Sequence, residues 1–282
     1  TASTGLVLTC NTLVLPFTGT ANATGGITPT VTETTSATGP NHLDNGDNYE
    51  GCSAPGTGDD IVIRNTADSI LYALESADLF GDITVDSTFT GEIGLPEINA
   101  ADYVEYRPTF LKRGAAAFTL EVGIGNGRKS PRINIDANAS DVTARIYGTG
   151  SATEDYAVWL KNTGSSSAID IYDGSVKLDA ASSGSMANLR VTPTGGTQPN
   201  VLATDTVACG AIQQSGGTLE VRGSATSLTA SGNGITTFLD AATCPTITVS
   251  TGARVVWGST AGITTNLYVH HGGSIDFSAN GS

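Results

Sequence analysis

Paired carboxylates are the side chains in this sequence whose types and spacing could support catalysis. A glycosidase needs two carboxyl groups roughly 5–9.5 Å apart, one acting as the acid and the other as the base or nucleophile. The acidic candidates form three groups: Asp59 with Asp60, Asp136 with Asp141, and Glu97 with Asp102 and Glu105. Asp59 and Asp60 follow a glycine, where an Asp side chain commonly bonds back to the backbone of its own turn. We therefore predict a turn role for this pair and assign no catalytic residue, so the chain is predicted not to be an enzyme.

Two of the four cysteines occupy equivalent places in similar segments. Cys209 lies three residues before Ile212, and Cys244 lies three residues before Ile247. If these segments were neighbouring coils, the two Cα atoms would fall within the 4.4–6.8 Å that a disulfide needs. A reduced stack of small buried side chains is the alternative.

The remaining metal and thiol candidates are weaker. Cys10 and Cys52 would staple the N-terminal region if the compartment were oxidising. No pair of cysteines has the C-x-x-C spacing, and three histidines make a zinc site a poor interpretation. The acidic run around Gly46 lacks the ligand order of an EF-hand loop. We expect no metal and no cofactor.

An aromatic and basic stretch between residues 103 and 113 differs from the rest of the chain. Aromatic residues and Arg are enriched where proteins make their strongest contacts with partners. The predicted partner interface consists of Tyr103, Tyr106, Arg107, Phe110, Lys112, Arg113, Arg128, Lys129 and Arg132. Two alternatives stay open: a lateral loop packed on the body of the protein, and a solvated basic face bridged to local carboxylates.

Four segments of the chain can be aligned, and each is a short alternating strand, a glycine-containing turn and a second alternating strand. They run from Ile169 to Leu178, from Ile212 to Val221, from Ile247 to Trp257 and from Leu267 to Phe277. A unit of this kind cannot bury its apolar face alone, so it must stack on copies of itself. The pattern predicts an all-β fold, a parallel β-solenoid, with the right-handed winding that parallel crossovers prefer.

The spacing of the aligned segments suggests the length of one coil. Equivalent positions at Val176, Leu219, Val255 and Ile275 are separated by 43, 36 and 20 residues. The shortest value fits one coil of a three-stranded solenoid, and 43 fits two coils. The value of 36 fits either one coil with a long loop or two short coils. The side chains expected to point inward are Ile169, Ile171, Val176, Leu178, Leu219, Val221, Ile247, Val249, Val255, Leu267, Ile275 and Phe277.

The chain divides at about residue 58. Residues 1–58 are rich in Thr, Gly and Asn and carry no Lys or Arg, so we interpret them as an irregular arm or cap. A cap would cover the open backbone groups of the first coil. Residues 59–282 form the predicted solenoid, with a docking insertion near 96–115.

The charge balance restricts the classes of partner. A net charge of −14 makes nucleic acid an unsuitable ligand, because phosphate neutralisation needs Lys and Arg. No run of about 18 apolar residues is present, so we expect no membrane insertion.

Three segments carry a resemblance to known proteins: Gly58 to Ile63, Phe89 to Pro96 and Tyr103 to Leu111. Over residues 58–282 the chain resembles parallel β-helix proteins of bacteriophage particles and bacterial surfaces. The resemblance implies a structural or interaction protein of a virion, as a capsid decoration or tail-associated component. It also implies homo-oligomers, of which a trimer is one arrangement, and contacts with other virion or surface proteins. The alternative is a secreted or surface β-helix that binds or cleaves polysaccharide.

Overall fold

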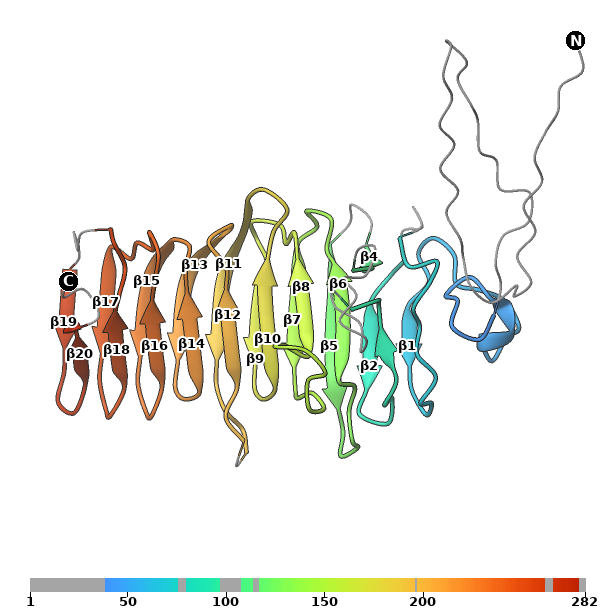
Figure 1. The fold of residues 1–282 in the computed structure, drawn as a ribbon, viewed down its shortest axis with the longest axis horizontal. Coiled ribbons are helices and arrows are strands. Elements are labelled where there is room, and N and C mark those ends of the chain that lie inside the picture. The colour runs from blue at the N-terminus through green and yellow to red at the C-terminus, as the bar shows by residue number, and fades with distance from the viewer. Residues whose placement is uncertain are drawn as a thin grey trace, which may run out of the picture.

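The protein is an all-β rod in which parallel strands stack coil upon coil (Figure 1). The computed structural model describes residues 39–75, 80–96, 108–113, 117–195, 197–261 and 266–278. Within these ranges there is no α-helix, and one short 3-10 helix spans Gly46–Asn48. About nine turns form the stack, which confirms the predicted parallel β-solenoid.

Two sheets run along the rod, and each coil contributes one strand to each. Sheet 1 contains, in spatial order, β1 (Ile61–Ile63), β2 (Ile83–Asp86), β5 (Phe118–Ile124), β7 (Val142–Ile146), β9 (Ala168–Ile171), β11 (Gly184–Val191), β13 (Val207–Gln214), β15 (Ala225–Ala230), β17 (Thr246–Val249) and β19 (Asn266–Val269). Every pairing in it is parallel.

Sheet 2 faces sheet 1 across the core. It contains β3 (Glu92–Ile93), β6 (Arg132–Asp136), β8 (Val158–Lys161), β10 (Ser175–Asp179), β12 (Asn200–Ala203), β14 (Thr218–Val221), β16 (Ile235–Phe238), β18 (Arg254–Trp257) and β20 (Ser274–Asp276). A further strand, β4 (Leu111–Lys112), pairs with β6 on the same side as β3.

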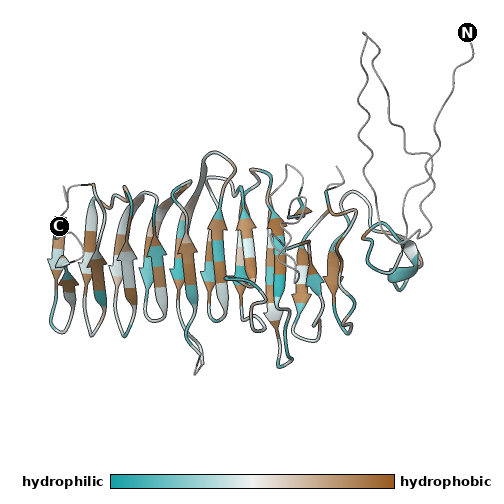
Figure 2. Ribbon diagram, viewed as in Figure 1, coloured by the Kyte–Doolittle hydropathy of each residue, from teal (hydrophilic) through white to brown (hydrophobic). Residues whose placement is uncertain are grey.

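The alternating sequence of each strand explains the core. Successive side chains of a strand point to opposite faces, so every second residue is buried between the sheets. Figure 2 shows hydrophobic and hydrophilic residues alternating along many of the strands. Nine of the twelve residues predicted to point inward are buried, and the other three, Leu267, Ile275 and Phe277, belong to the last coil described.

The coils differ from the three-stranded arrangement that the sequence suggested. Two full strands per coil are present, and a third parallel segment appears only as an extension of sheet 1, where Gly184–Met186 pairs with Val207–Cys209. The ladder skips Ala187 at the corner, opposite Gly210. A Cβ atom on Gly210 would lie 2.1 Å from the carbonyl oxygen of Ala187, so the corner requires glycine. The third face is therefore short and merges with sheet 1.

Residues 39–49 cover the N-terminal end of the stack. Leu43 is buried and its amide donates to the carbonyl of Tyr72 at 3.1 Å. The side chain of Asn41 donates to the carbonyl of Ser69, and the hydroxyl of Tyr49 donates to the carbonyl of Leu43. This part of the predicted N-terminal region is a cap, whereas residues 1–38 lie outside the described residues.

Opposite charges alternate along the outside of both sheets. In sheet 1 the register stacks Glu121, Arg145, Asp170 and Arg190 in one column, with ion pairs of 3.3 Å between Arg145 and Glu121 and between Arg190 and Asp170. In sheet 2 the corresponding column holds Lys112, Asp136, Lys161 and Asp179. Parallel in-register stacking places each side chain about 4.8 Å from its neighbour, where like charges would repel.

Candidate functional site

One rung of sheet 2 is interrupted by an excursion of the chain. Strand β3 pairs Glu92 and Ile93 with the first half of β6, and β4 pairs Leu111 and Lys112 with the second half. The two strands are thus halves of one rung, and the chain leaves it at Gly94 and rejoins it after Phe110. We call residues 94–110 the excursion; its residues 97–107 lie outside the described residues. The excursion coincides with most of the insertion predicted near 96–115.

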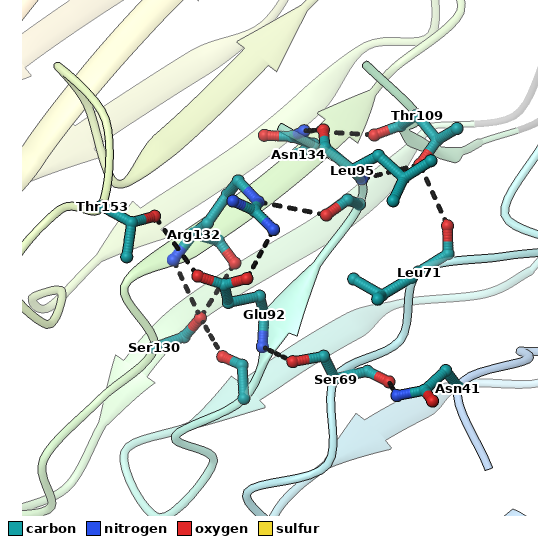
Figure 3. A network of polar contacts seen from close by, with 12 residues as sticks. Asn41, Ser69, Leu71, Glu92, Leu95, Thr109, Ser130, Arg132, Asn134 and Thr153 are labelled. Atoms are coloured by element: carbon teal, nitrogen blue, oxygen red, sulfur yellow. Dashed lines mark hydrogen bonds and ion pairs between the residues drawn. The ribbon is translucent and has the colours of Figure 1, made fainter. Parts of the chain in front are cut away.

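Asn134 holds the two ends of the excursion together. It occupies the central position of β6, opposite the break in the rung, and its side-chain amide donates to the carbonyls of Leu95 and Thr109, both at 3.1 Å. The Thr109 hydroxyl accepts the amide of Leu95 at 2.8 Å and lies 3.1 Å from the carbonyl of Leu71 in the preceding coil. Figure 3 shows these contacts converging at the base.

The backbone at the exit point is one that only glycine can adopt without strain. Gly94 has a φ of +90°, and a Cβ atom there would lie 2.2 Å from the carbonyl oxygen of Thr109. The two ends of the excursion therefore approach each other through main-chain atoms.

A buried ion pair supports the same base from below. The Arg132 guanidinium contacts the carboxylate of Glu92 and donates from Nε to the carbonyl of Gly94 at 3.1 Å. Glu92 also accepts the hydroxyl of Thr153, and Ser130 donates to the carbonyl of Gly91 (Figure 3). Because both charges are hydrogen-bonded as well as paired, the pair fixes geometry without leaving a buried charge unsatisfied.

An aromatic and cationic row lies next to the base on the outer face of sheet 2. The ring of Phe110 meets that of Trp159 edge-on at 5.0 Å. Lys161 lies 3.5 Å above the Phe110 ring, and Lys177 lies 3.7 Å above the Trp159 ring. The indole N–H of Trp159 donates to Asp179 at 3.2 Å. These contacts fasten the returning end of the excursion onto the stack.

The predicted partner interface is divided by the structure. Phe110, Arg113 and Arg132 are buried in the stack and so cannot be surface contacts. Lys112 lies in the column of alternating charges opposite Asp136. The described members therefore do not form one basic band: Lys129 reaches the carbonyl of Tyr147 at 3.3 Å, Arg128 is exposed, and Tyr103, Tyr106 and Arg107 lie outside the described residues.

Arg113 is the most unusual of these cations. Its guanidinium lies over the ring of Phe118 at 5.2 Å, and its Nε and Nη1 atoms have no hydrogen-bond partner in the described part of the chain. Burial lowers the pKa of Arg113, against the opposing influence of Asp82 and Asp60.

The candidate catalytic carboxylates hold turns and coils together. Asp60 accepts the amide of Asp82 in the next coil at 2.7 Å, and Asp141 accepts the amide of Ser166 at 2.9 Å. Asp59 accepts the amide of Gly56, and Asp136 accepts the amide of Asn138 and contacts Lys161. Their oxygen atoms thus make the backbone contacts of turns. Glu97, Asp102 and Glu105 lie outside the described residues, and within the described ranges no three His, Cys, Asp or Glu side chains gather as a metal site would require.

Cys209 and Cys244 are separated by a complete coil, which corrects the prediction of adjacent positions. Cys209 pairs with Ala225, and the bridge between Ser224 and Thr243 places Cys244 beyond Ala225 in the same column. Two rungs correspond to about 9.6 Å, too far for a direct disulfide. The arrangement matches the reduced stack of small side chains. Burial raises the pKa of the Cys209 thiol to about 12 and that of Cys244 to about 11. Cys52 is exposed, and Cys10 lies outside the described residues.

Comparisons of this chain with protein-family models, curated proteins and solved structures find no match. Among the residues that the structure describes, no helix has the length and apolar character needed to cross a membrane.

The sequence interpretation missed the residues that build the base. Asn134 stands at an outward position of an alternating strand, where polar residues are ordinary, and Thr109 looks like a loop residue. The available signals were the Gly94-Leu95-Pro96 break and Pro108, which bracket the excursion. Neither signal shows that the two breaks meet in space.

Proposed function

We propose that this chain is a non-enzymatic structural and interaction protein of a bacteriophage particle, as a capsid decoration or tail-associated component. The solenoid would be a rigid rod, and the excursion would be its docking element for other virion proteins. The observation that carries this proposal is the clamp on Asn134, which holds both ends of an excursion from an otherwise continuous ladder. A rigid base lowers the entropy lost when a presented segment binds.

Two further arguments support a structural role. The described candidate carboxylates are engaged in holding turns and neighbouring coils. The virion location rests on the resemblance of the sequence to parallel β-helix proteins of phage particles and bacterial surfaces. Under this proposal the partners are copies of the chain and other virion proteins, and the interface is centred on Tyr103, Tyr106 and Arg107 of the excursion.

The test uses a variant that removes the excursion and keeps its base. Replacing residues 97–107 by a short Gly-Ser linker leaves Leu95, Thr109 and Asn134 in place, so the solenoid should remain folded. A matched control shortens the loop between β11 and β12 at residues 194–198. Antibodies against the chain should label purified particles that carry the wild-type or control protein and should fail to label those with the linker variant. Equal labelling of all three, or no labelling of wild-type particles, would contradict the proposal.

A polysaccharide-binding surface protein is the second candidate. Tyr147 and Tyr172 stack at 5.3 Å and are half-buried at the edge of sheet 1, where aromatic rings can lie against sugars. Incubating the chain with bacterial glycans and measuring new reducing ends and unsaturated products separates the candidates. We expect no products and no glycan retention; retention that is lost in Tyr172→Ala would favour this second function.

A further inference from the structure

The last coil described exposes apolar side chains that belong to the core pattern. Leu267, Tyr268, Val269 and Phe277 are 38–53% exposed and are four of the six large hydrophobic residues exposed in the described ranges. All four residues of β19 are exposed, although no other strand of four or more residues has this pattern among those described.

The register shows that three of these side chains continue inward-facing columns. Leu267 and Val269 pair with Ile247 and Val249, which are fully buried in the preceding coil. Phe277 follows Asp276, the partner of Val256, and so takes the next place after Phe238 and Trp257. The core is therefore open at this end, and β19 and β20 each have one unpaired edge within the described sheets. An open edge of this kind is a template for pairing with another chain.

The electrostatics of this coil permit contact with an identical surface. The chain has a net charge of −14, yet Asp276 is the single Asp, Glu, Lys or Arg between residues 266 and 278. Its carboxylate is already paired with Arg254. Two copies that approach through this coil thus avoid most of the repulsion that their other surfaces would produce.

The two ends of the rod are not equivalent. At the N-terminal end the segment 39–49 lies against the first coils, with Leu43 buried (Figure 1). A second copy stacked head to tail would therefore meet this cap instead of an open coil. Two open edges meet only when the last coils of two copies face each other.

We propose that this coil binds the same coil of a second copy, giving an end-to-end dimer with a two-fold axis perpendicular to the rod. Either such axis sets β19 antiparallel to an edge strand of the partner, because rotation reverses one of the two strand directions. The interface is small: a coil of two short strands about 10 Å apart offers roughly a few hundred Å² per copy, below the standard size class. We therefore expect weak, concentration-dependent association. This inference refines the homo-oligomer part of the proposed function but does not depend on the particle.

The test measures the mass of the full 282-residue chain by sedimentation equilibrium from about 1 µM to several hundred µM, the range in which weak complexes form. The expected mass rises from 28.6 kDa towards twice that value. Val269→Lys should hold the protein at the monomer mass over the whole range. The matched control is Thr248→Lys, which adds the same charge on the outer face of the preceding coil, in register with Tyr268.

Hydrogen exchange makes the result independent of the folding of the variant. Wild-type amides of β19 and β20 should gain protection between the low and the high concentration, whereas amides of β13 and β14 should not change. A monomer at every concentration, a mass three times that of the chain, or a dimer that survives Val269→Lys would overturn the proposal. Loss of particle labelling alone would not affect it.

Discussion

The indole of Trp257 lies in the core in tilted contact with the ring of Phe238 at 4.9 Å. Its N–H finds no acceptor among the described residues, and a buried unpaired donor costs about 1–3 kcal/mol. Trp257→Phe removes the donor and keeps an aromatic ring, so the lost packing volume is offset by the lost penalty. We expect a change in unfolding free energy within about 1 kcal/mol for Trp257→Phe, against a loss of about 3–5 kcal/mol for Trp257→Ala. Urea denaturation of the two variants measures both values.

The two Arg–Glu pairs between coils differ in burial and should differ in value. Arg132 is 5% exposed beside Glu92, whereas the Arg145–Glu121 pair lies on the outer face of sheet 1. Glu92→Ala leaves a buried guanidinium without its carboxylate and should destabilise the protein by about 3–5 kcal/mol. The matched change Glu121→Ala should cost less than about 1 kcal/mol. Equal denaturant midpoints for the two variants would contradict this account of the base.

The buried thiols make stability depend on alkaline pH. The folded-state pKa values of Cys209 and Cys244, about 12 and about 11, lie above the unfolded value of about 8.5. Folding therefore keeps both protons, and this contribution is fully present below pH 8.5 and is lost as pH rises towards the folded values. Between pH 9 and 10.5 the unfolding free energy should fall more steeply than in Cys209→Ala/Cys244→Ala, by up to about 1.4 kcal/mol per pH unit and thiol. Parallel slopes for the two proteins would refute the assignment.

Among the elements, strand β15 decides the relation between the two cysteines. Because Ala225 pairs with Cys209 and precedes Cys244 in the column, a thiol at position 225 would lie one rung from either neighbour. One rung of about 4.8 Å falls within the range that a disulfide needs. Oxidised Ala225→Cys should therefore contain one internal disulfide to Cys209 or Cys244, found by peptide mapping. Wild-type protein and Ser227→Cys, whose side chain faces outward, should show no bond to either residue.

The same strands show why coil counting from the sequence was incomplete. Between Val176, Leu219 and Val255 the register inserts Val201 and Thr236, so the spacings of 43 and 36 residues each contain two coils. The prediction of two coils for 43 is confirmed, and of the two options for 36 the short coils are correct. The intervening units escaped detection because Thr236 fills a core position, where its hydroxyl donates to the buried side chain of Gln214. A polar residue satisfied by a partner from another coil leaves no apolar signal.

At the scale of the element the prediction of the fold was better than that of the site. Alternation within single strands was enough to predict inward positions such as Ile171 and Val249, which are fully buried. The base of the excursion depends on Asn134 meeting Leu95 and Thr109, which are 39 and 25 residues away in sequence. Short-range patterns do not contain that contact, because it arises only when parallel coils stack in register.

At the scale of the whole molecule, the stack is one-dimensional, since each coil contacts mainly the coils before and after it. Its stability should be a sum of coil terms and neighbour terms, and opening should begin where a neighbour is missing. The covered N-terminal end and the open last coil thus predict an asymmetric order of unfolding. Figure 1 shows both ends of the rod and the continuous middle.

Native-state hydrogen exchange at low micromolar concentration tests this order. Amides of β20 should open with free energies near zero, and the values should rise through β18 and β16 towards the global unfolding value in β9 to β14. At higher concentration the gradient should flatten at β19 and β20, because association covers the open coil there. A uniform opening free energy from β9 to β20 at low concentration would mean that the rod unfolds as a single unit. The open last coil would then not be the site where unfolding begins.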